Sequence, residues 1–530
     1  MRRSRLRSMM RGYRKLKNEG CLDLISSIKD QIGEQELSDI NSEGMSRYLG
    51  AGMPWATVIL RQFLLLRFAG LDLNKAILVA CNQQGRISIP LPREWRRVFR
   101  DHHFLINERK SALLWFACVA MYWLRGTMQI CIVMFLGLKA ALRHATPSNE
   151  NSAFFHSLSD KNLPFEESSE PEGRNIFSWY SWWSGKFQGV TVFEHDVKDA
   201  SPRKAGGIPV VPGSPIPLPR LPHEWAAYMR WALFAIIGSF LDLLRGHWIP
   251  CILLGESAKA AAVRYAKARE IPKENMFHNS NWLYRPLWTY EAEARGSATI
   301  FYFYSTNAES FKRPEGYARQ ENQWHFTNWP RYLVWDEWQR DFILRVTPNK
   351  PVIDVVGPID FTTGITDLPA VEPGFIAVFD VQPVRKSYYE CLGIGFEYYT
   401  PETAIRFLED IAAKAAEAGK VVLLKKKRTI GKAAHPRYRN IVEQLTAKGL
   451  LMPVDPSTDA RRMIARSSLV ISMPFTSTAL LGREEEKPSC YYDAAGLVQK
   501  DDRAAHGIAI VSGPEELANW IYTSSLGGSE

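Results

Sequence analysis

Ser467-Ser-Leu-Val-Ile-Ser-Met-Pro-Phe-Thr-Ser-Thr-Ala479 places a short apolar run directly before a cluster of hydroxyl side chains. The run Leu469–Ser472 shows no alternation of polar and apolar residues, which is typical of a parallel strand covered on both faces. A helix is expected to begin around Thr476 to Thr478, since hydroxyl residues cap helix starts. This stretch predicts one strand–turn–helix unit of an α/β domain.

The same pattern surrounds this unit in the C-terminal third of the chain. A helix is predicted at Pro401–Ala418, with Thr400 as its N-cap and Gly419 just beyond its end. Further apolar runs predict strands at Phe375–Val381, Val421–Lys425, Ser489–Tyr492 and Ile508–Val511. Strands that alternate with helices predict a doubly wound α/β domain.

The preceding half carries a less regular version of the pattern. Strands are predicted at Ala76–Asn82, Cys251–Leu254, Thr299–Tyr304, Tyr332–Trp335 and Val352–Val356, and another near Cys131. The segments that begin at Cys131 and Cys251 resemble each other, which indicates either a repeated strand–helix unit or a coincidence. The proline-rich segment Ser201–Pro222 predicts an extended surface loop.

Together these elements predict an α/β protein with two Rossmann-like domains facing a cleft and with extra N-terminal helices. We expect a helix-rich region with a short strand unit at 1–110, an α/β domain at 111–368 and a Rossmann-like domain at 369–530.

Composition narrows the class of partner. The chain of 530 residues is 46% hydrophobic and carries a formal net charge of +10, which suits an anionic partner such as a nucleotide or an acidic lipid surface. We find no zinc spacing, RNA-binding signature or long basic tract, so nucleic acid is not expected. The seven cysteines are scattered and never spaced C-x-x-C, which indicates free thiols in a reducing compartment and no zinc site.

Three segments are relevant to the question of whether the protein contacts or spans a membrane. The basic stretch Met1–Lys17 lacks the apolar core of a signal peptide, and is either a solvated tail or a membrane-surface anchor. Leu113–Leu138 is apolar but contains Arg125, and Trp231–Leu244 is shorter than a span needs. We therefore expect buried or interfacial helices, and a peripheral location on the cytoplasmic face of the membrane.

The hydroxyl-rich turn is the first candidate site. Ser472, Thr476, Ser477 and Thr478 lie where a strand ends and a helix begins, where free N–H groups and the helix dipole favour a phosphate. The alternative is a helix cap without a ligand.

Two further groups follow strand ends in the same domain. Lys425, Lys427 and Arg428 emerge from one strand, followed by His435 and Pro436, and Gln382 follows another. Ligands of open α/β sheets bind at the carboxyl ends of strands, so these residues are expected to bind the nucleotide. A solvated charged face and an ordinary turn are the alternatives.

Carboxylates at strand ends of the N-terminal half are candidates for a general base. Glu256 and Asp336 are the leading candidates, and Asp360 is another. Caps and turns are the common roles of such residues. The sequence contains no D-x-D pair of the kind that metal-dependent sugar-nucleotide enzymes use, no phosphate loop and no dinucleotide fingerprint. No metal and no cofactor beyond the donor are therefore expected.

The C-terminal series of strand, Gln-Pro, basic strand, His-Pro and S-S-L-V-I-S-M-P-F-T-S-T-A-L resembles bacterial surface-carbohydrate biosynthesis proteins. It is also similar to GT-B transferases that use CMP-activated acidic sugars, the sialyltransferases and capsule Kdo transferases. Those families hold CMP with a His-Pro pair and a Ser/Thr pair, which implies His435, Pro436, Ser477 and Thr478 here. The likeness extends loosely over Pro250 to Pro369, but the acidic motif of sialyltransferases has no counterpart.

This resemblance implies a GT-B-like glycosyltransferase that moves a CMP-linked ulosonic acid, such as Kdo or a sialic-type sugar, onto a surface polysaccharide or lipopolysaccharide glycan. The implied acceptor is a glycan on a lipid carrier. A UDP-sugar or CDP-polyol donor on the same fold is one alternative. A non-catalytic assembly protein at the membrane is the other.

Overall fold

The structure is a computed structural model. It describes residues 3–526 apart from 35–47, 49–62, 64–69, 84, 143–150, 166–173, 185–188, 281–282, 307–308, 318–321, 348–349, 362–366, 385–386, 388–389, 391–397 and 427–433. Lys427 and Arg428, two of the predicted nucleotide ligands, lie outside the described residues.

The C-terminal domain is built on a six-stranded, wholly parallel sheet with the order β13-β12-β11-β14-β15-β16. Its strands are β11 (Ile376–Asp380), β12 (Val422–Lys426), β13 (Met452–Val454), β14 (Leu469–Ser472), β15 (Ser489–Asp493) and β16 (Ala509–Ser512). This order is that of a doubly wound Rossmann sheet, in which the direction of strand addition reverses between β11 and β14 while all strands stay parallel. Ligands of such sheets bind beside that switch point, at the carboxyl ends of the strands.

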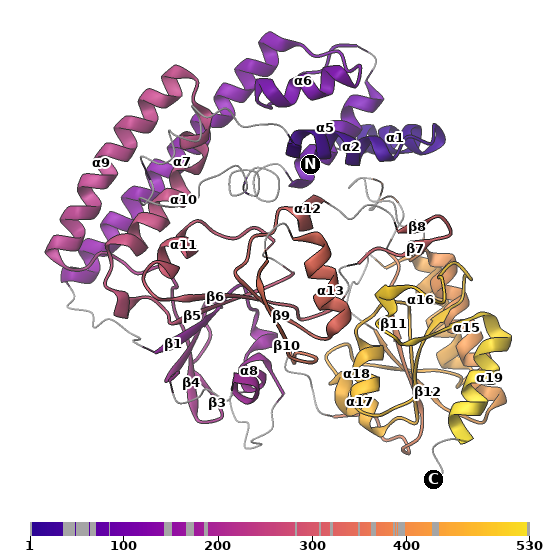
Figure 1. The fold of residues 1–530 in the computed structure, drawn as a ribbon. Helices are drawn as coiled ribbons and strands as arrows, with labels where there is room; N and C mark the ends of the chain where they lie inside the picture. Colours follow the sequence, from indigo (N-terminus) through magenta and orange to yellow (C-terminus); the bar gives the residue numbers. More distant parts are fainter. Residues whose placement is uncertain are drawn as a thin grey trace.

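Helices cover both faces of this sheet (Figure 1). They are α15 (Pro401–Glu417), α16 (Pro436–Ala447), α17 (Ala460–Arg466), α18 (Thr478–Glu484) and α19 (Gly513–Leu526). The α15 prediction is confirmed in detail: the Thr400 side chain accepts from the Thr403 N–H, and Gly419 adopts a φ of 63° beyond the helix end. The predicted strands of this domain are confirmed as β11, β12, β14, β15 and β16, whereas β13 was not predicted.

The N-terminal domain has an eight-stranded sheet with the order β10-β9-β6-β5-β1-β2-β4-β3, parallel except for β3 against β4. The strands are β1 (Ser152–Phe155), β2 (Val192–His195), β3 (Arg203–Ala205), β4 (Ile208–Pro212), β5 (Glu274–His278), β6 (Ala298–Tyr302), β9 (Arg331–Val334) and β10 (Val352–Val355). Its switch point lies between β1 and β5. Two Rossmann-like sheets confirm the predicted fold class.

Helices surround this second sheet and extend away from it. Those nearest in sequence to the strands are α8 (Ile176–Ser184), α10 (Trp248–Tyr265), α11 (Trp288–Glu293), α12 (Asn322–His325) and α13 (Glu337–Val346), and a small hairpin forms from β7 (Lys312–Arg313) and β8 (Gly316–Tyr317). The long helices α7 (Glu108–Leu142) and α9 (Pro222–Arg245) pack on α10. Gly126 makes this packing close, because a Cβ there would lie 2.7 Å from the Leu254 side chain.

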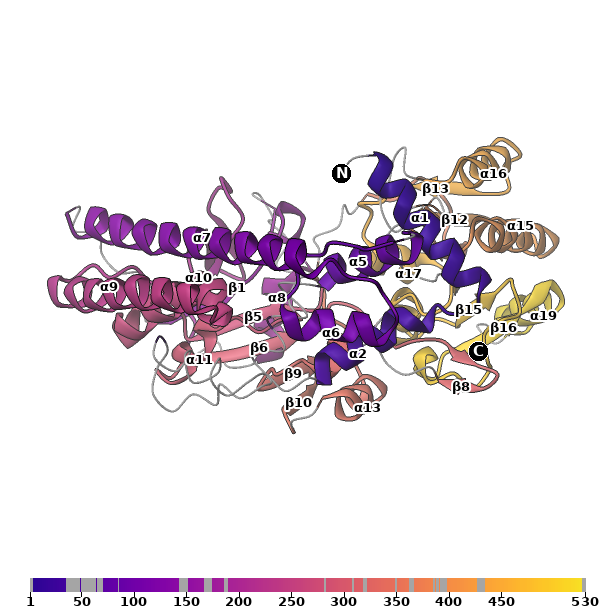
Figure 2. The same ribbon diagram turned by 90° about the horizontal axis from the view of Figure 1, so that it is seen from above.

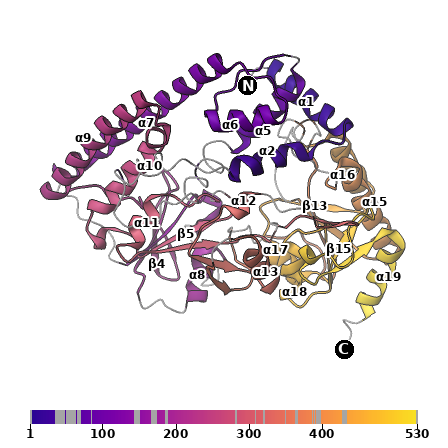
Figure 3. The same cartoon turned by 45° about the horizontal axis from the view of Figure 1, so that its top comes forward.

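The N-terminal helices form a separate layer. They are α1 (Arg3–Asn18), α2 (Asp23–Glu34), α5 (Gly70–Asn82) and α6 (Arg93–Asp101). Figure 3 shows this layer above both sheets, between the α7–α9 pair and the C-terminal domain. A contact of 3.0 Å between Arg14 and Glu390 joins α1 to the C-terminal half. The sheets occupy 152–355 and 376–512, and the predicted domain boundaries stay a prediction.

Four predictions for the N-terminal half were wrong. Ala76–Asn82 belongs to helix α5, and the segments from Cys131 and Cys251 belong to helices α7 and α10. An apolar run without alternation fits a buried strand and a buried helix equally well, so periodicity does not separate them. The predicted loop at Ser201–Pro222 contains β3 and β4, because Val210 and its neighbours pair with β2.

Candidate functional site

The turn after β14 has an unusual backbone. Phe475 adopts a φ of 60°, in the left-handed region that bulky residues avoid, yet it is only 5% exposed. Its ring packs on Phe311 at 4.6 Å and on Tyr491 at 5.6 Å between ring centroids. Such strain persists only where surrounding contacts enforce it, and it concentrates at functional positions.

The hydroxyl groups of this turn have partners within the protein. Thr476 Oγ1 donates to the carbonyl of Met473 at 2.9 Å, and the hydroxyls of Ser472 and Thr478 bond each other at 2.9 Å. The Ser477 hydroxyl accepts the backbone N–H of Thr306, from the N-terminal domain, at 3.2 Å. The helix that follows, α18, spans only seven residues. The geometry therefore assigns these hydroxyls to holding the turn and to joining the domains.

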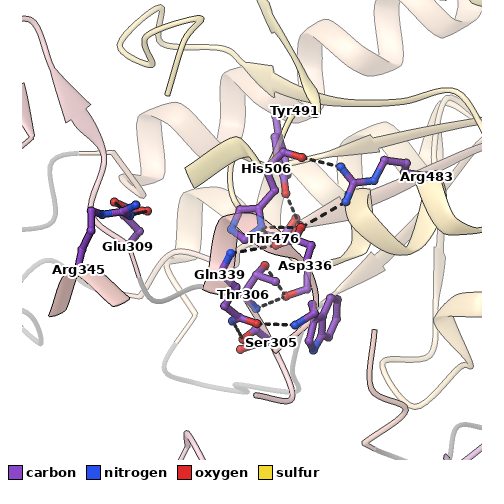
Figure 4. Close-up of polar contacts among 12 residues, drawn as sticks. Ser305, Thr306, Glu309, Asp336, Gln339, Arg345, Thr476, Arg483, Tyr491 and His506 are labelled. Carbon is purple, nitrogen blue, oxygen red and sulfur yellow. Dashed lines mark hydrogen bonds and ion pairs between the residues drawn. The ribbon is translucent and has the colours of Figure 1, made fainter. Parts of the chain in front are cut away.

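Asp336 reinforces the same junction. It caps α13 by accepting the Gln339 N–H at 3.0 Å, and both of its carboxylate oxygens lie 2.8 Å from His506 Nδ1 of the C-terminal domain. Arg483 approaches it at 3.4 Å (Figure 4). Burial alone raises the pKa of Asp336, but these contacts outweigh burial and hold its pKa below the ordinary value. The carboxylate is committed to a domain contact.

A second bridge lies beside the first. Asp360, which follows β10, pairs at 2.7 Å with the Arg461 guanidinium of α17, and Arg461 also pairs with Glu484 and Glu485. Burial raises the pKa of Asp360 despite this partner. Residues that follow β9 and β10 of the N-terminal sheet are thus held by charged and polar contacts to the C-terminal domain.

Glu256 does not lie at a strand end, contrary to the prediction. It lies within helix α10, where Oε1 pairs with Lys259 at 2.9 Å. The prediction failed because Cys251–Leu254 was interpreted as a strand, so Glu256 was assigned to its end. The geometric reason for a catalytic role of Glu256 is therefore lost.

The loops after β11 and β12 form a different environment on the other side of the switch point. The backbone N–H of His435 donates to the carbonyl of Pro383 at 3.0 Å, which brings His435 next to Gln382. His435 precedes Pro436, the first residue of the twelve-residue helix α16, whose first turn contains no acidic residue. Within the described part of the chain, no hydrogen-bond partner lies within reach of Gln382 Oε1 or His435 Nδ1, although both atoms are buried.

Lys425 and Asp380 complete this environment. Lys425 Nζ donates to the Pro456 carbonyl at 3.0 Å, and burial lowers the pKa of this amine. Burial raises the pKa of Asp380 to about 6, although the Tyr438 hydroxyl donates to its carboxylate. Unpartnered buried polar atoms are rare in native proteins, and beside a helix N-terminus they indicate a place for a polar, anionic ligand.

Sequence reasoning missed the polar residues at the switch point of the N-terminal sheet. Asp196, directly after β2, accepts the backbone N–H groups of Ser157 at 2.7 Å and Leu158 at 3.1 Å while its side chain remains exposed. Partial burial raises its pKa, against the effect of these two bonds. His278, at the end of β5, lies 3.2 Å from the Ser157 carbonyl, and burial lowers its pKa to about 4.

The loop that Asp196 holds reaches the C-terminal domain. Lys161, three residues beyond Leu158, lies close enough to Lys425 and Asp455 to influence the pKa of both by its charge. The signal in the sequence was the short run Val192–His195 with Asp196 at its end. Among the residues that the structure describes, no group of three His, Cys, Asp or Glu side chains could hold a metal ion.

Comparison with known protein families identifies a named sequence motif in the strained turn after β14. The family model described as "Polysaccharide biosynthesis PFTS motif protein" matches residues 231–521. The chain belongs to this family. The letters of its name occur here as Pro474-Phe475-Thr476-Ser477, the turn between β14 and α18 that joins the two domains. No curated protein gave a match to the sequence.

Solved structures show only weak likeness. The wall teichoic acid polymerase TagF, as a variant, has 11% identity and a TM-score of 0.38 over 76% of this chain and 90% of its own. TarM has 10% identity and a TM-score of 0.31, and only 52% of its chain is covered, against 51% of this one. The UDP-GlcNAc 2-epimerase of Methanocaldococcus jannaschii with UDP-GlcNAc and UDP has 9% identity and a TM-score of 0.34, over 71% and 92%. Likeness at this level assigns no activity.

Proposed function

We propose that this polysaccharide biosynthesis protein is a glycosyltransferase that takes its sugar from a nucleotide-linked donor. The nucleotide binds at the carboxyl edge of the C-terminal sheet, between Gln382, His435 and the N-terminus of α16. The observation that carries the proposal is a pair of buried atoms, Gln382 Oε1 and His435 Nδ1, that the described residues leave without a partner beside the N-terminus of α16, where no side-chain cap is described. The amide oxygen of Gln382 can accept a hydrogen bond from a base or ribose, and the N-terminus of α16 can bind a phosphate.

The acceptor hydroxyl lies at the switch point of the N-terminal sheet in this proposal. Its oxygen forms a bond to the anomeric carbon of the sugar as the bond from that carbon to the nucleotide phosphate breaks. The electron pair leaves on the phosphate, where Lys425 and the α16 dipole stabilise the charge. Asp196 accepts the proton of the hydroxyl, since it is exposed, fixed by two N–H groups and raised in pKa toward neutrality. Asp196 therefore replaces Glu256 as our candidate base.

The resemblance to Kdo and sialyltransferases favours a CMP-linked donor, and a UDP-sugar suits the same site equally well. Thermal unfolding of the full chain with CMP, CDP and UDP separates these donors. Stabilisation by CMP alone supports a CMP-linked acidic sugar, and stabilisation by UDP alone supports a UDP-sugar. If no nucleotide raises the unfolding temperature, the protein is a non-catalytic assembly component and the proposal is wrong.

The role of Asp196 has a separate test. Asp196→Asn is expected to slow nucleotide release from the stabilising donor, in the presence of acceptor membranes, by roughly 100- to 10,000-fold. Nucleotide affinity should stay unchanged. Asp199→Asn is the matched control, because Asp199 lies on the same loop with a φ of 57°, a conformation that Asn tolerates. Equal rates in the two variants would remove Asp196 from the mechanism.

A further inference from the structure

Most of the large hydrophobic side chains that are exposed in the described part of the chain lie on α7 and α9. Of the 29 large hydrophobic side chains exposed in the described residues, eleven lie on α7 between Leu113 and Leu142 and six lie on α9 between Leu233 and Leu244. Soluble monomers rarely expose a continuous apolar patch above a few hundred Å². These two helices, which we call the α7–α9 face, therefore have a partner.

The two helices form one layer. Trp123 Nε1 of α7 donates to the Ser239 hydroxyl of α9 at 3.0 Å, and Trp225 Nε1 of α9 donates to the Met134 carbonyl of α7 at 3.2 Å. These contacts run in opposite sequence directions, so the helices are antiparallel. Figure 2 shows both at the outside of the molecule, with the N-terminal helices continuing the layer toward the C-terminal domain.

Charge on this layer is distributed as at a membrane surface. After Glu108, the first residue of α7, neither helix exposes an acidic side chain, because Glu224 and Asp242 of α9 are buried. Cations lie near the helix ends at Lys110, Lys139 and Arg245. Cations that flank an apolar helical surface reach the phosphate level while the apolar side chains enter the lipid.

The neighbouring helices add net positive charge, although α6 also carries the exposed Glu94 and Asp101. Helix α1 exposes Arg5, Arg7, Arg11, Arg14, Lys15 and Lys17 and contains no acidic residue, and α6 exposes Arg93, Arg97 and Arg100. A basic surface that continues an apolar one is complementary to a bilayer with anionic headgroups.

The position of Arg125 favours a bilayer surface as the partner over a second copy of the chain or a bilayer span. It is exposed near the middle of the apolar stretch of α7. A two-fold contact between copies of the chain, centred on this face, would bury Arg125 against its own counterpart, which like-charge repulsion opposes. A bilayer span would place it in hydrocarbon, which is costly. At the membrane surface the guanidinium can reach a lipid phosphate.

Two helices, Glu108–Leu142 and Pro222–Leu244, are long and apolar enough to cross a membrane by length and composition, but the fold favours a surface position. Residues from Ser111 to Gly137, spaced by three, four or seven, are buried against the protein along the length of α7. One side of this helix therefore always contacts protein. Helices α7 and α9 are also mostly exposed. The expectation of buried core helices is therefore wrong, and the expectation of interfacial helices remains.

We propose that the α7–α9 face embeds in the surface of an anionic bilayer and, with the basic α1 and α6, holds the protein on the membrane. This inference does not rest on the nucleotide site. It specifies the surface by which a protein acting on a lipid-linked glycan would reach its acceptor.

Sedimentation of the full chain with lipid vesicles tests the proposal. The wild type is expected to bind vesicles containing phosphatidylglycerol about tenfold better than vesicles of phosphatidylcholine alone. Met128→Glu with Ile237→Glu, at positions 58% and 59% exposed, should reduce binding about tenfold or more. Leu344→Glu with Val352→Glu, at exposed sites on α13 and β10, is the matched control and should bind like the wild type.

The proposal is overturned if the wild type ignores both vesicles, if the α7–α9 variant binds like the wild type, or if sedimentation velocity shows a wild-type dimer that this variant abolishes. Amide hydrogen exchange of the wild type with and without anionic vesicles covers the case of a variant that does not fold. Slower exchange should be confined to α7, α9 and the basic helices, and slowing elsewhere alone contradicts the proposal. Nucleotide-induced stabilisation should persist in the variant, which separates this failure from failure of the proposed reaction.

Discussion

The two sides of the C-terminal switch point use polar residues differently. After β14, the PFTS turn is rich in hydroxyls, but Thr476, Ser477 and Thr478 all bond within the protein. After β11 and β12, by contrast, Gln382 and His435 bury atoms that the described chain leaves unpartnered. The presence of polar groups is therefore a poorer guide to a binding site than the partners that those groups lack.

This comparison assigns different work to the two sides. In our proposal the β11 side binds the donor, whereas the β14 side contacts the other domain through Ser477, and Asp336 and His506 join the domains as well. Strain at Phe475 then serves to direct the turn toward the N-terminal domain.

The largest effect is expected on the β11 side. Gln382→Ala with His435→Ala should weaken binding of the stabilising nucleotide by roughly 100-fold, about 3 kcal/mol, because two hydrogen bonds to a polar ligand are lost. Gln444→Ala, on the exposed side of α16, is the control and should leave affinity unchanged. Titration calorimetry measures both, and an unchanged affinity in the double variant would contradict the assignment.

The next largest effect is expected for Asp380, which makes the free energy of unfolding depend on pH. Because burial raises its pKa to about 6, the folded protein holds this proton more tightly than the unfolded chain does. Its favourable contribution is therefore present at low pH and is lost as the pH rises through about 6. Asp380→Asn should raise the free energy of unfolding by about 2 kcal/mol near pH 8 and change it little near pH 4. Denaturant unfolding at the two pH values measures this, and a pH-independent effect would refute it.

At the domain junction, Asp336→Asn should lower the free energy of unfolding by roughly 1 to 2 kcal/mol at neutral pH, because the carboxylate's contacts to His506 and Arg483 are weakened. Since the pKa of Asp336 is depressed, this contribution is present above about pH 4 and is lost as the pH falls through its folded pKa. Asp341→Asn, exposed on the same helix, is the control. Indistinguishable thermal unfolding of the two variants would argue against the junction.

The smallest effect is expected within the PFTS turn. Thr478→Val removes the bond to Ser472 and should lower the free energy of unfolding by about 1 kcal/mol. Nucleotide affinity should remain within about twofold, since the hydroxyl serves the protein and not the ligand. A tenfold loss of affinity in calorimetry would restore the phosphate role that the sequence pattern indicates.

The sequence predicted the regular parts of the fold and the position of the turn. Helix α15 was predictable because Thr400, Pro401 and Gly419 mark its ends, and β14 because its apolar run stops at a polar turn. Ala76–Asn82 and Cys251–Leu254 were misassigned because their apolar runs give no period that separates helix from strand. Strand β13 escaped because three residues with Pro453 in the middle carry almost no pattern.

The sites were predictable only in part. Strand ends predicted where Gln382, His435 and Thr476 lie, because ligand positions follow from topology. The contacts from Ser477 to Thr306 and from Asp336 to His506 join residues 171 and 170 positions apart, and no local pattern encodes them. Asp196 was missed because a four-residue strand before it was not recognised.

The most direct test is a crystal structure of the full chain with the nucleotide that stabilises it most. The account predicts a phosphate at the start of α16, within hydrogen-bond distance of His435, and a base or ribose group at Gln382 Oε1. A phosphate bound instead by the hydroxyls of Thr476, Ser477 and Thr478, with their bonds to Met473, Thr306 and Ser472 broken, would contradict it.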